Sequence, residues 1–566
     1  MRKQILPGRL LLFVAACLFL LLACDGLSSG LLGDPNAAAM EKAATQTAQQ
    51  LNLTPSVVPT NTPSPTITPS PTPAPALWVS SSLPAAFRDA FSPPPGWRSA
   101  DSADTAMLRV EVGDGRPVAS WVYALVVPFP TVVDGLTSEE FRQTWSGVPV
   151  GPFSLLPLLM DQNSLDVLSA QFGPPRPDAV RVVPTDQLVE TAWLNLPSWA
   201  VVPFEAIEPR WKVLEVDGMS PLRRDFTPAA YPLTVTISLD GDSALAEQAA
   251  ASASFPAANR DPAKLTTLAM TGVTALVRAT AWLMEQRDIL YPAQDIGPIL
   301  LSADITHVSN EVPFARDCPY PDPSPGMRPF CSDPRYIDLL ESIGTNVVEL
   351  TGNHMQDWGS EAMLFTLDLY RQRGWSYFGG GANLAEARQA LTLEHNGNRL
   401  AFLGCNAVTN DPSWATEGTP GSAPCDMEYF QAEIRRLREA NYLPVMTFQY
   451  YESYQVEPIV DQAEDFFSMA DAGAVIVSGS QAHFPQTFSI RNGSMIHFGL
   501  GNLFFDQYNV MTGTRNAFID RHVFYAGRYL GTELITIVFE DNARARMMTP
   551  AEREAFLLAV FSASSW

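Results

Sequence analysis

Apolar strand-like runs alternate with amphipathic helical segments from Lys264 onward, and this alternation restricts the C-terminal half of the chain to an α/β fold. One of these helices opens at Asp333-Pro334 and ends at Gly344, because glycine readily adopts the left-handed conformation that closes a helix. We expect strands at 346–350, 400–405, 445–448, 474–477 and 495–500, and helices at 360–373, 426–440 and 460–472. The pattern predicts a layered α/β domain over residues 262–545.

Polar residues cluster directly after three of the expected strands, at 352–357, 479–483 and 501–507. In α/β folds, binding and catalytic sites form at the carboxyl ends of strands. One histidine or asparagine in such a turn is as often an ordinary hydrogen-bonding residue as a ligand. Three such turns in one domain favour a site.

Residues 77–255 have a second mixed α/β pattern, with an apolar run at 121–127, a helix at 138–145 and strands at 200–202 and 233–238. The periodicity stops at 252–261, where we place the boundary between the two domains. A chain of 566 residues exceeds what one hydrophobic core usually serves, so at least two domains are expected. The first block has no obvious catalytic cluster.

The N-terminus has the features of an export signal. Basic residues at 2, 3 and 9 precede an apolar run of 13 residues at 10–22, which is shorter than the ~20 residues that span a bilayer core. Leu21 and Ala23 before Cys24 resemble the bacterial lipobox, and this resemblance implies that Cys24 is acylated and begins the mature chain. We therefore expect a lipoprotein signal peptide over 1–24 and an extracytoplasmic protein anchored to the cell membrane.

Residues 25–76 are expected to form a stalk and a linker. The segment 55–75 is rich in Pro, Thr and Ser, and proline fixes φ and removes backbone donors, so an extended spacer is predicted. At ~3.1 Å per residue this spacer could reach on the order of 60 Å. The formal net charge is −24 and there is no basic stripe, which argues against a nucleic-acid partner.

The chain has six cysteines, of which Cys17 lies in the signal and Cys24 is the proposed lipid site. An even remainder of four suits an oxidising compartment. The simplest pairing is local, because each pair brackets a loop rich in Pro, Gly or Ser: Cys318 with Cys331, and Cys405 with Cys425. Metal binding by these four is the lesser interpretation, since no C-x-x-C spacing occurs.

Three long motifs in the C-terminal half resemble the CapA family, at 351–389 (TGNHMQDWGSEAM and onward), 472–486 (AGAVIVSGSQAHFPQ) and 495–507 (MIHFGLGNLFFDQ). The similarity covers roughly 265 to 540. That family belongs to the metallophosphatase-like superfamily and is associated with poly-γ-glutamate capsule synthesis and export. The resemblance implies a four-layer α/β/β/α sandwich with a metal centre between the sheets.

The sequence departs from the family at its ligand positions. Where the family has Gly-Asp, this chain has Gly272-Val273, and a valine cannot bind a cation. Gln449 and Gln481 stand where the family has histidines, while Glu311 preserves a carboxylate. The donors that remain are Glu311, Asn353, His354, Asp357 and His483, with weak carbonyl donors on Gln449 and Gln481. A dinuclear centre needs more anionic oxygen and imidazole ligands than this, so the site would hold one divalent metal ion or none.

Parts of residues 77–255 resemble type 2 periplasmic solute-binding proteins, particularly the phosphate-binding group. The matching stretches are 79–91, 124–147 and 199–207. In that family, hydroxyl and backbone N–H groups at a helix N-terminus hold an oxyanion, so the resemblance makes Ser80, Ser81 and Ser82 candidate ligand contacts. The alternative, slightly favoured, is that these serines cap a helix.

Two hypotheses follow for the C-terminal domain. In the first, it is a metal-dependent hydrolase acting on an envelope polymer, with His354, Asp357, Glu311 and His483 as catalytic residues and Asn353, His354 and His483 as metal ligands. In the second, the site is degenerate and binds a polyanionic envelope polymer or a capsule-assembly protein. The candidate binding residues are Asn353, Gln449, Gln481, Asn502 and Asp506. The substitutions modestly favour the second hypothesis, and the sequence does not decide whether the domain is an enzyme.

Overall fold

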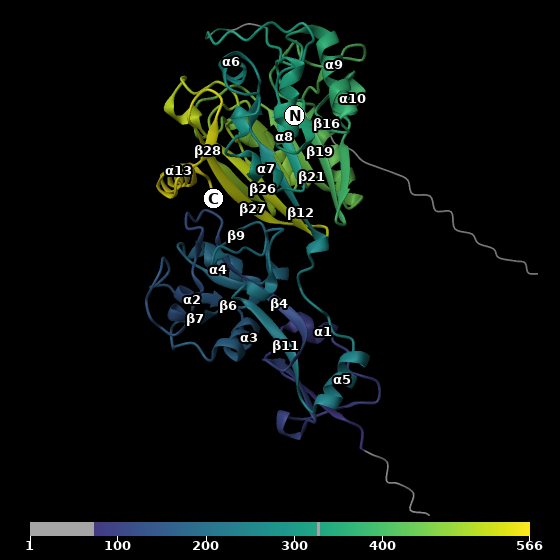
Figure 1. Cartoon of the computed structure of the whole chain (residues 1–566), viewed down its shortest axis with the longest axis vertical. Coiled ribbons are helices and arrows are strands. Elements are labelled where there is room, and N and C mark those ends of the chain that lie inside the picture. Colours follow the sequence, from purple (N-terminus) through teal and green to yellow (C-terminus); the bar gives the residue numbers. More distant parts are fainter. Residues whose placement is uncertain (1–72, 325, 327–328) are drawn as a thin grey trace, which may run out of the picture. The chain divides into compact units, whose positions relative to one another are not determined.

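The computed structural model describes residues 73–324, 326 and 329–566, which belong to one compact unit (Figure 1). The predicted signal peptide, the lipidation site Cys24 and almost all of the stalk and linker lie outside the described residues. Within the described part, no helix combines the length and the apolar character needed to cross a bilayer. The division into domains at 255–262 stays a prediction.

The N-terminal part contains a nine-stranded mixed sheet in the order β2-β1-β3-β11-β4-β8-β6-β7, with β9 paired to β4. Its strands are β1 Ala76–Val79, β2 Arg98–Ser99, β3 Leu108–Val112, β4 Arg116–Pro128, β6 Leu158–Met160, β7 Val180–Val182, β8 Ala200–Pro203, β9 Trp211–Val213 and β11 Thr234–Gly241. A small separate pair joins β5 Gly135–Leu136 to β10 Glu215–Val216. The helices of this part are α1 Ala85–Ala90, α2 Ser138–Trp145, α3 Gln162–Phe172, α4 Leu188–Leu194 and α5 Ser243–Ser252.

Sequence patterns predicted these elements well. The apolar run at 121–127 is the buried part of β4, the helix at 138–145 is α2, and the strands at 200–202 and 233–238 are β8 and β11. α2 begins after Thr137, whose hydroxyl accepts from the backbone N–H of Glu140 while the Glu140 carboxylate accepts from the N–H of Thr137.

The interpretation of the serines after β1 as a helix cap is wrong. α1 starts behind Pro84, which has no side-chain oxygen to cap it, and the Oδ1 of Asn163 accepts from the backbone N–H of Ala85 at 2.8 Å. The hydroxyl of Ser80 instead accepts from the backbone N–H of Ser82 at 3.1 Å, within the turn that precedes the helix. The proline at the cap position keeps the serines two or more residues away from the first helical N–H groups.

The C-terminal part contains two larger sheets. The first has the order β16-β15-β14-β12-β26-β27-β28, with β13 paired to β14 and β25. It comprises β12 Leu265–Thr271, β13 Val273–Thr274, β14 Ile305–Asn310, β15 Thr345–Glu349, β16 Ser376–Phe378, β25 Asn502–Phe504, β26 Asn516–Tyr525, β27 Arg528–Phe539 and β28 Ala545–Met547. The second has the order β18-β19-β21-β22-β24-β23 and comprises β18 Leu391–His395, β19 Asn398–Asn406, β21 Leu443–Gln449, β22 Ile476–Ser480, β23 Phe488–Arg491 and β24 Ser494–His497. A short pair joins β17 Gly380–Gly381 to β20 Gly421–Ser422.

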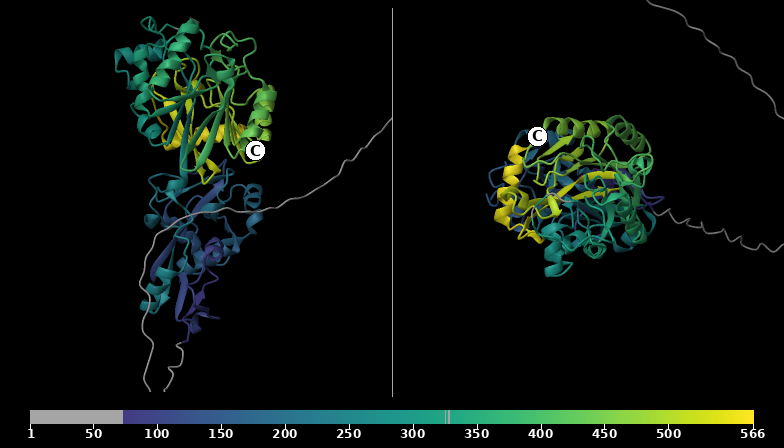
Figure 2. Two further views of the ribbon diagram at one scale, coloured as in Figure 1. Left: turned by 90° about the vertical axis from the view of Figure 1, so that its right-hand side faces the viewer. Right: turned by 90° about the horizontal axis from the view of Figure 1, so that it is seen from above.

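These two sheets pack face to face, and helices cover their outer faces (Figure 2). The core between the sheets contains Met270 of β12, Phe402 of β19 and Phe518 of β26. The helices are α6 Arg278–Gln286, α7 Gly297–Leu301, α8 Ile337–Ser342, α9 Gly359–Gln372, α10 Leu384–Arg388, α11 Met427–Glu439, α12 Val460–Ala472 and α13 Pro550–Ala563. The predicted four-layer α/β/β/α sandwich is therefore confirmed, as are the strands and helices that alternate within it.

Both predicted disulfides are present, Cys318–Cys331 and Cys405–Cys425. They close loops of 13 and 20 residues within the C-terminal part. Crosslinks of this span restrict the unfolded chain and stabilise the folded state.

Replacing Cys405 and Cys425 together by alanine should lower the free energy of unfolding by about 3 kcal/mol, because a loop of 20 residues is released in the unfolded chain. Urea unfolding of the full chain measures the change. The Cys318→Ala/Cys331→Ala pair, with its shorter loop, should lose slightly less. Equal stability of the wild type with and without a reductant would contradict this prediction.

Candidate functional site

Four polar side chains from both sheets meet at the carboxyl ends of their strands. Glu311 follows β14 and Asn353 follows β15 in the first sheet, whereas Gln449 ends β21 and Gln481 follows β22 in the second. The Nε2 of Gln449 donates to Glu311 Oε1 at 3.2 Å, to Asn353 Oδ1 at 3.0 Å and to the Oε1 of Gln481. We call these four side chains the amide cage.

The amide of Gln449 has a fixed orientation. The hydroxyl of Ser480 donates to Gln449 Oε1 at 2.7 Å, which leaves the NH2 end directed at the three oxygens. Two hydrogens thus serve three acceptors. Glu311, Gln449 and Gln481 are only 2%, 1% and 4% exposed, so water has little access to the cage.

Backbone geometry holds the cage together. A Cβ atom on Gly352 would lie 2.6 Å from the Cα of Glu311, so only glycine lets the turn after β15 approach the end of β14. Gln481 has a φ of 76°, a left-handed conformation that is unfavourable for a residue with a side chain. Strained residues of this kind concentrate at functional sites.

A polar partner orients the ring of each of the two predicted histidines, His354 and His483. The Nδ1 of His354 bonds to Asp357 Oδ2 at 2.8 Å, and the Nδ1 of His483 bonds to Asn502 Oδ1 at 2.8 Å. Each pairing orients a ring and leaves its Nε2 as the nitrogen that can face a ligand. His354 is partly exposed, whereas His483 is buried.

Arg278 is the residue that sequence reasoning missed. Its guanidinium lies 5.1 Å from the ring centre of Phe330 and 5.0 Å from that of Phe505. Phe330 also contacts the His354 ring, and Phe505 contacts the His483 ring. The sequence could have pointed to Arg278, because this residue lies five positions after Val273, which stands in the first ligand motif of the CapA family.

Asp506, a predicted binding residue, is fully engaged within the protein. Its carboxylate accepts from Arg278 Nε at 3.1 Å, from the Nη2 of the same arginine and from the backbone N–H of Ala279. The side chain of Asp506 is 7% exposed. Its position therefore fits a role in holding Arg278.

The electrostatics of the site depend on its carboxylates. Burial by itself would lower the pKa of His354, but the hydrogen bond to Asp357 and the charges of Glu311 and Asp357 outweigh burial and raise it. Among the described residues, no lysine or arginine forms an ion pair with Glu311. Glu311 is thus one of the carboxylates that favour the protonated form of His354.

The donor set does not suit a divalent cation in this arrangement. A cation among Glu311, Asn353 and Gln481 would have to displace the amide nitrogen of Gln449, which already donates to these oxygens. Over residues 73–324, 326 and 329–566, no group of three or more His, Cys, Asp or Glu side chains is arranged to hold a metal ion.

The site contains every predicted residue of the C-terminal half and none of the N-terminal ones. Ser80, Ser81 and Ser82 follow β1 in the sheet of the N-terminal part. Two nearby aromatic residues, Tyr450 and Phe504, are buried and serve in packing.

The C-terminal part is thus a four-layer α/β/β/α sandwich with a polar site at the carboxyl ends of the strands of both sheets. Residues 241–507 match the family model described as bacterial capsule synthesis protein PGA_cap. This match supports the predicted assignment of the C-terminal half to the CapA family.

Two similar curated proteins support this assignment. The chain is 28% identical over 172 residues to the PGA biosynthesis protein CapA of Bacillus subtilis (strain 168), which covers 30% of this chain and 45% of that protein. It is 27% identical over 175 residues to the capsule biosynthesis protein CapA of Bacillus anthracis, covering 30% and 43%. The matches thus span less than half the length of these relatives.

A solved structure resembles part of the chain only loosely. An ABC-type phosphate transport receptor from Vibrio cholerae matches 31% of this chain and 91% of its own, at 12% identity and a TM-score of 0.25. A score this low carries no argument about ligands. The predicted solute-binding role of Ser80 to Ser82 stays a prediction.

Proposed function

We propose that this chain acts in the synthesis, export or attachment of an envelope polymer of the poly-γ-glutamate type, and that it binds the polymer and does not hydrolyse it. The similarity of the C-terminal half to the CapA family supports the polymer class. The two disulfides suit an oxidising compartment, which agrees with a lipoprotein anchored outside the cytoplasm through Cys24.

The observation that carries the proposal is the amide nitrogen of Gln449, which lies among oxygens of Glu311, Asn353 and Gln481. Its neutral NH2 group satisfies these oxygens by hydrogen bonds where a hydrolase of this superfamily would need a cation. The cage therefore stabilises the two sheet ends against each other, and the reaction centre of a metal-dependent hydrolase is lost.

The polymer would contact the rim of the site. His354 is partly exposed and has a raised pKa, so it retains a proton more readily than an ordinary histidine and attracts carboxylates. The buried negative charge of Glu311 keeps carboxylates out of the cage itself. The chain would thus hold a polyanion at its surface without drawing it into the interior.

The His354→Ala variant should bind poly-γ-glutamate at least ~10-fold more weakly than the wild type, because it loses a charge-assisted contact. Binding of the detergent-solubilised full chain to poly-γ-glutamate, measured by isothermal titration near pH 6.5, tests this. His395→Ala is the matched control, since His395 is also partly exposed but lies at the opposite ends of the strands. Equal weakening in both variants would contradict a role for the site.

The alternative is an active metal-dependent hydrolase of an envelope polymer, with His354 and His483 as ligands. The oriented Nδ1 atoms of both rings favour it, because metal-binding histidines are commonly held in this way. Metal content after purification without chelator separates the two functions. Stoichiometric metal that disappears in His354→Ala and His483→Ala would overturn the binding proposal.

A further inference from the structure

A cavity away from the amide cage lies between the N-terminal sheet and the first sheet of the C-terminal part. It has a volume of about 320 Å³. Its N-terminal wall comes from β9 and the segments beside it, including Lys212 and Arg223, and its other wall comes from β26, β27 and α13. A volume of this size is at the lower end of small-molecule sites, which occur preferentially between domains.

Charged side chains dominate one end of the cavity. Its lining includes four cations, Lys212, Arg223, Arg521 and Arg553, and three carboxylates, Asp134, Glu215 and Glu533. The lining thus carries one positive charge in excess, in a chain whose formal net charge is −24. An electropositive cavity in so acidic a protein selects for an anionic ligand.

The carboxylates do not satisfy all of the cationic donors. Asp134 accepts from Arg553 at 2.6 and 2.8 Å and from Lys212 at 2.8 Å. Arg521 Nη1 donates to Glu533 at 3.4 Å and Arg223 Nη2 donates to Glu215, while Arg223 Nε lies 3.6 Å from Glu533. The Nε atoms of both arginines are buried and have no hydrogen-bond acceptor among the described residues.

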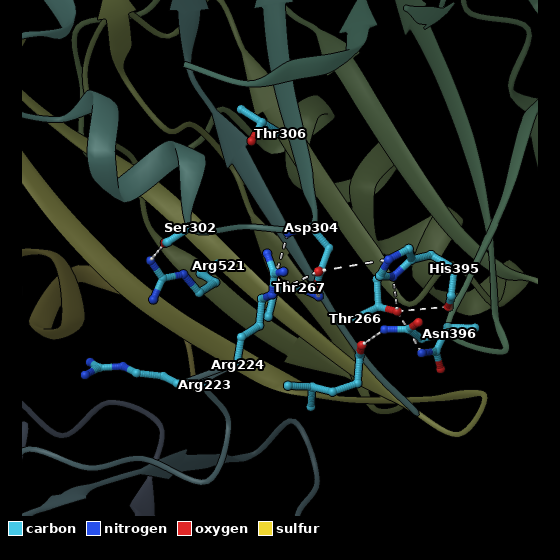
Figure 3. A network of polar contacts seen from close by, with 12 residues as sticks. Arg223, Arg224, Thr266, Thr267, Ser302, Asp304, Thr306, His395, Asn396 and Arg521 are labelled. Atoms are coloured by element: carbon cyan, nitrogen blue, oxygen red, sulfur yellow. Dashed lines mark hydrogen bonds and ion pairs between the residues drawn. The ribbon is translucent and has the colours of Figure 1, made fainter. Parts of the chain in front are cut away.

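Figure 3 shows how Arg521 is positioned: its guanidinium donates to Ser302 at 2.9 Å, while Arg224 pairs separately with Asp304 at 3.1 Å. Arg521 and Arg223 both extend toward the left in this view, away from the Arg224–Asp304 pair. The side chains of Arg223 and Arg521 both line the cavity, so an anionic group of a ligand would gain charge-assisted contacts with them.

The remaining wall is apolar. It is formed by Phe129, Val213, Leu534, Ile535, Met547 and Phe561. Phe129 and Phe561 also pack against each other, with ring centres 6.0 Å apart. A ligand for this cavity needs a hydrocarbon body beside its charged group.

We infer that this cavity binds a small organic monoanion, with one carboxylate at the Arg223 and Arg521 end and an apolar body against the phenylalanines. The one excess positive charge of the cavity lining matches the single negative charge of such a ligand. Because the cavity joins both parts of the chain, such a ligand would stabilise the contact between them.

Proton uptake by Lys212 offers a second, independent way to detect binding of an anion. Burial, together with the charge of Arg553, lowers its pKa to about 8 against the opposing effect of Asp134 and Glu215. A bound anion would raise that pKa, so binding at pH 8 should take up protons. The binding enthalpy should then differ between buffers of different ionisation enthalpy.

The test titrates the full chain with hexanoate, and with hexan-1-ol and hexylammonium as neutral and cationic analogues. Hexanoate should bind at least ~10-fold more tightly than either analogue, because only it accepts charge-assisted hydrogen bonds. Arg521→Met should lower hexanoate affinity ~10-fold or more, while Arg435→Met on the exposed face of α11 should leave it unchanged.

Met547→Trp covers the case in which Arg521→Met unfolds the chain. Met547 is 41% exposed at the edge of the cavity, so a larger side chain can fill the opening without disturbing the core. This variant should keep the charges and lose hexanoate binding. Absence of hexanoate binding to the wild type, equal binding of hexan-1-ol, or unchanged binding in Met547→Trp would each overturn the inference.

Discussion

Replacing Gln449 and Gln481 together by histidine is expected to give the site about one zinc ion per chain, whereas the wild type is expected to bind none under the same conditions. The Gln449 amide donates to three oxygens, whereas an imidazole offers a lone pair at the same place. Two imidazoles, the Glu311 carboxylate and the Asn353 carbonyl would provide four ligands of the types that zinc accepts. The Glu311 carboxylate would then be one of the ligands of the bound cation.

Metal analysis after dialysis against micromolar zinc measures this gain. Zinc should also stabilise the double variant by about 2.7 kcal/mol at a hundredfold excess over the dissociation constant, and leave the wild type unchanged. Gln431→His on the exposed face of α11 controls for adventitious binding. Equal zinc in the wild type and the double variant would show that the amide cage is not what excludes the metal.

The layered fold was readable from the sequence because strand and helix periodicities are local. The predicted helix at 460–472 coincides with α12, and the predicted strand at 445–448 lies inside β21. The ends of elements were less predictable. The strand expected at 495–500 ends at His497, because the chain must turn before Gly501 to begin β25.

The candidate site could be predicted only in part from the sequence. Motif comparison placed Gln449 and Gln481 at ligand positions, but it gave no indication that one amide donates to the other. Arg278 escaped notice because its contacts with Asp506 and Phe330 are made between segments far apart in sequence. Pairings between distant segments depend on how the strands are ordered in the sheets, and local periodicity carries no information about that order.

Low pH is expected to destabilise the C-terminal part through His522, a histidine that neither the binding proposal nor the hydrolase alternative uses. His522 of β26 is 1% exposed, and its Nδ1 lies 3.1 Å from the hydroxyl of Tyr529 and 3.0 Å from that of Thr532. Its Nε2 has no hydrogen-bond partner among the described residues. Burial, with a contribution from the nearby His497 and against the opposing charge of Asp520, lowers its pKa from 6.5 to about 4.

The direction of the effect follows from this shift. Above pH 6.5 His522 is neutral in both the folded and the unfolded chain, so stability is at its full value. As the pH falls from 6.5 to about 4, His522 becomes protonated in the unfolded chain but stays neutral in the folded chain. The loss should reach about 3 kcal/mol at pH 4, since each pKa unit corresponds to about 1.4 kcal/mol.

Urea unfolding of the wild type and of His522→Gln between pH 7.5 and 4 measures this contribution. The variant should be less stable at pH 7.5, because it packs imperfectly, but its stability should fall by about 3 kcal/mol less across the range. Phe518→Leu is the control, since it weakens packing in the same strand without removing a titratable group. The free energy of unfolding of this control should change with pH in parallel with that of the wild type. If the pH dependence were parallel for all three proteins, His522 would take up its proton in the folded chain as well.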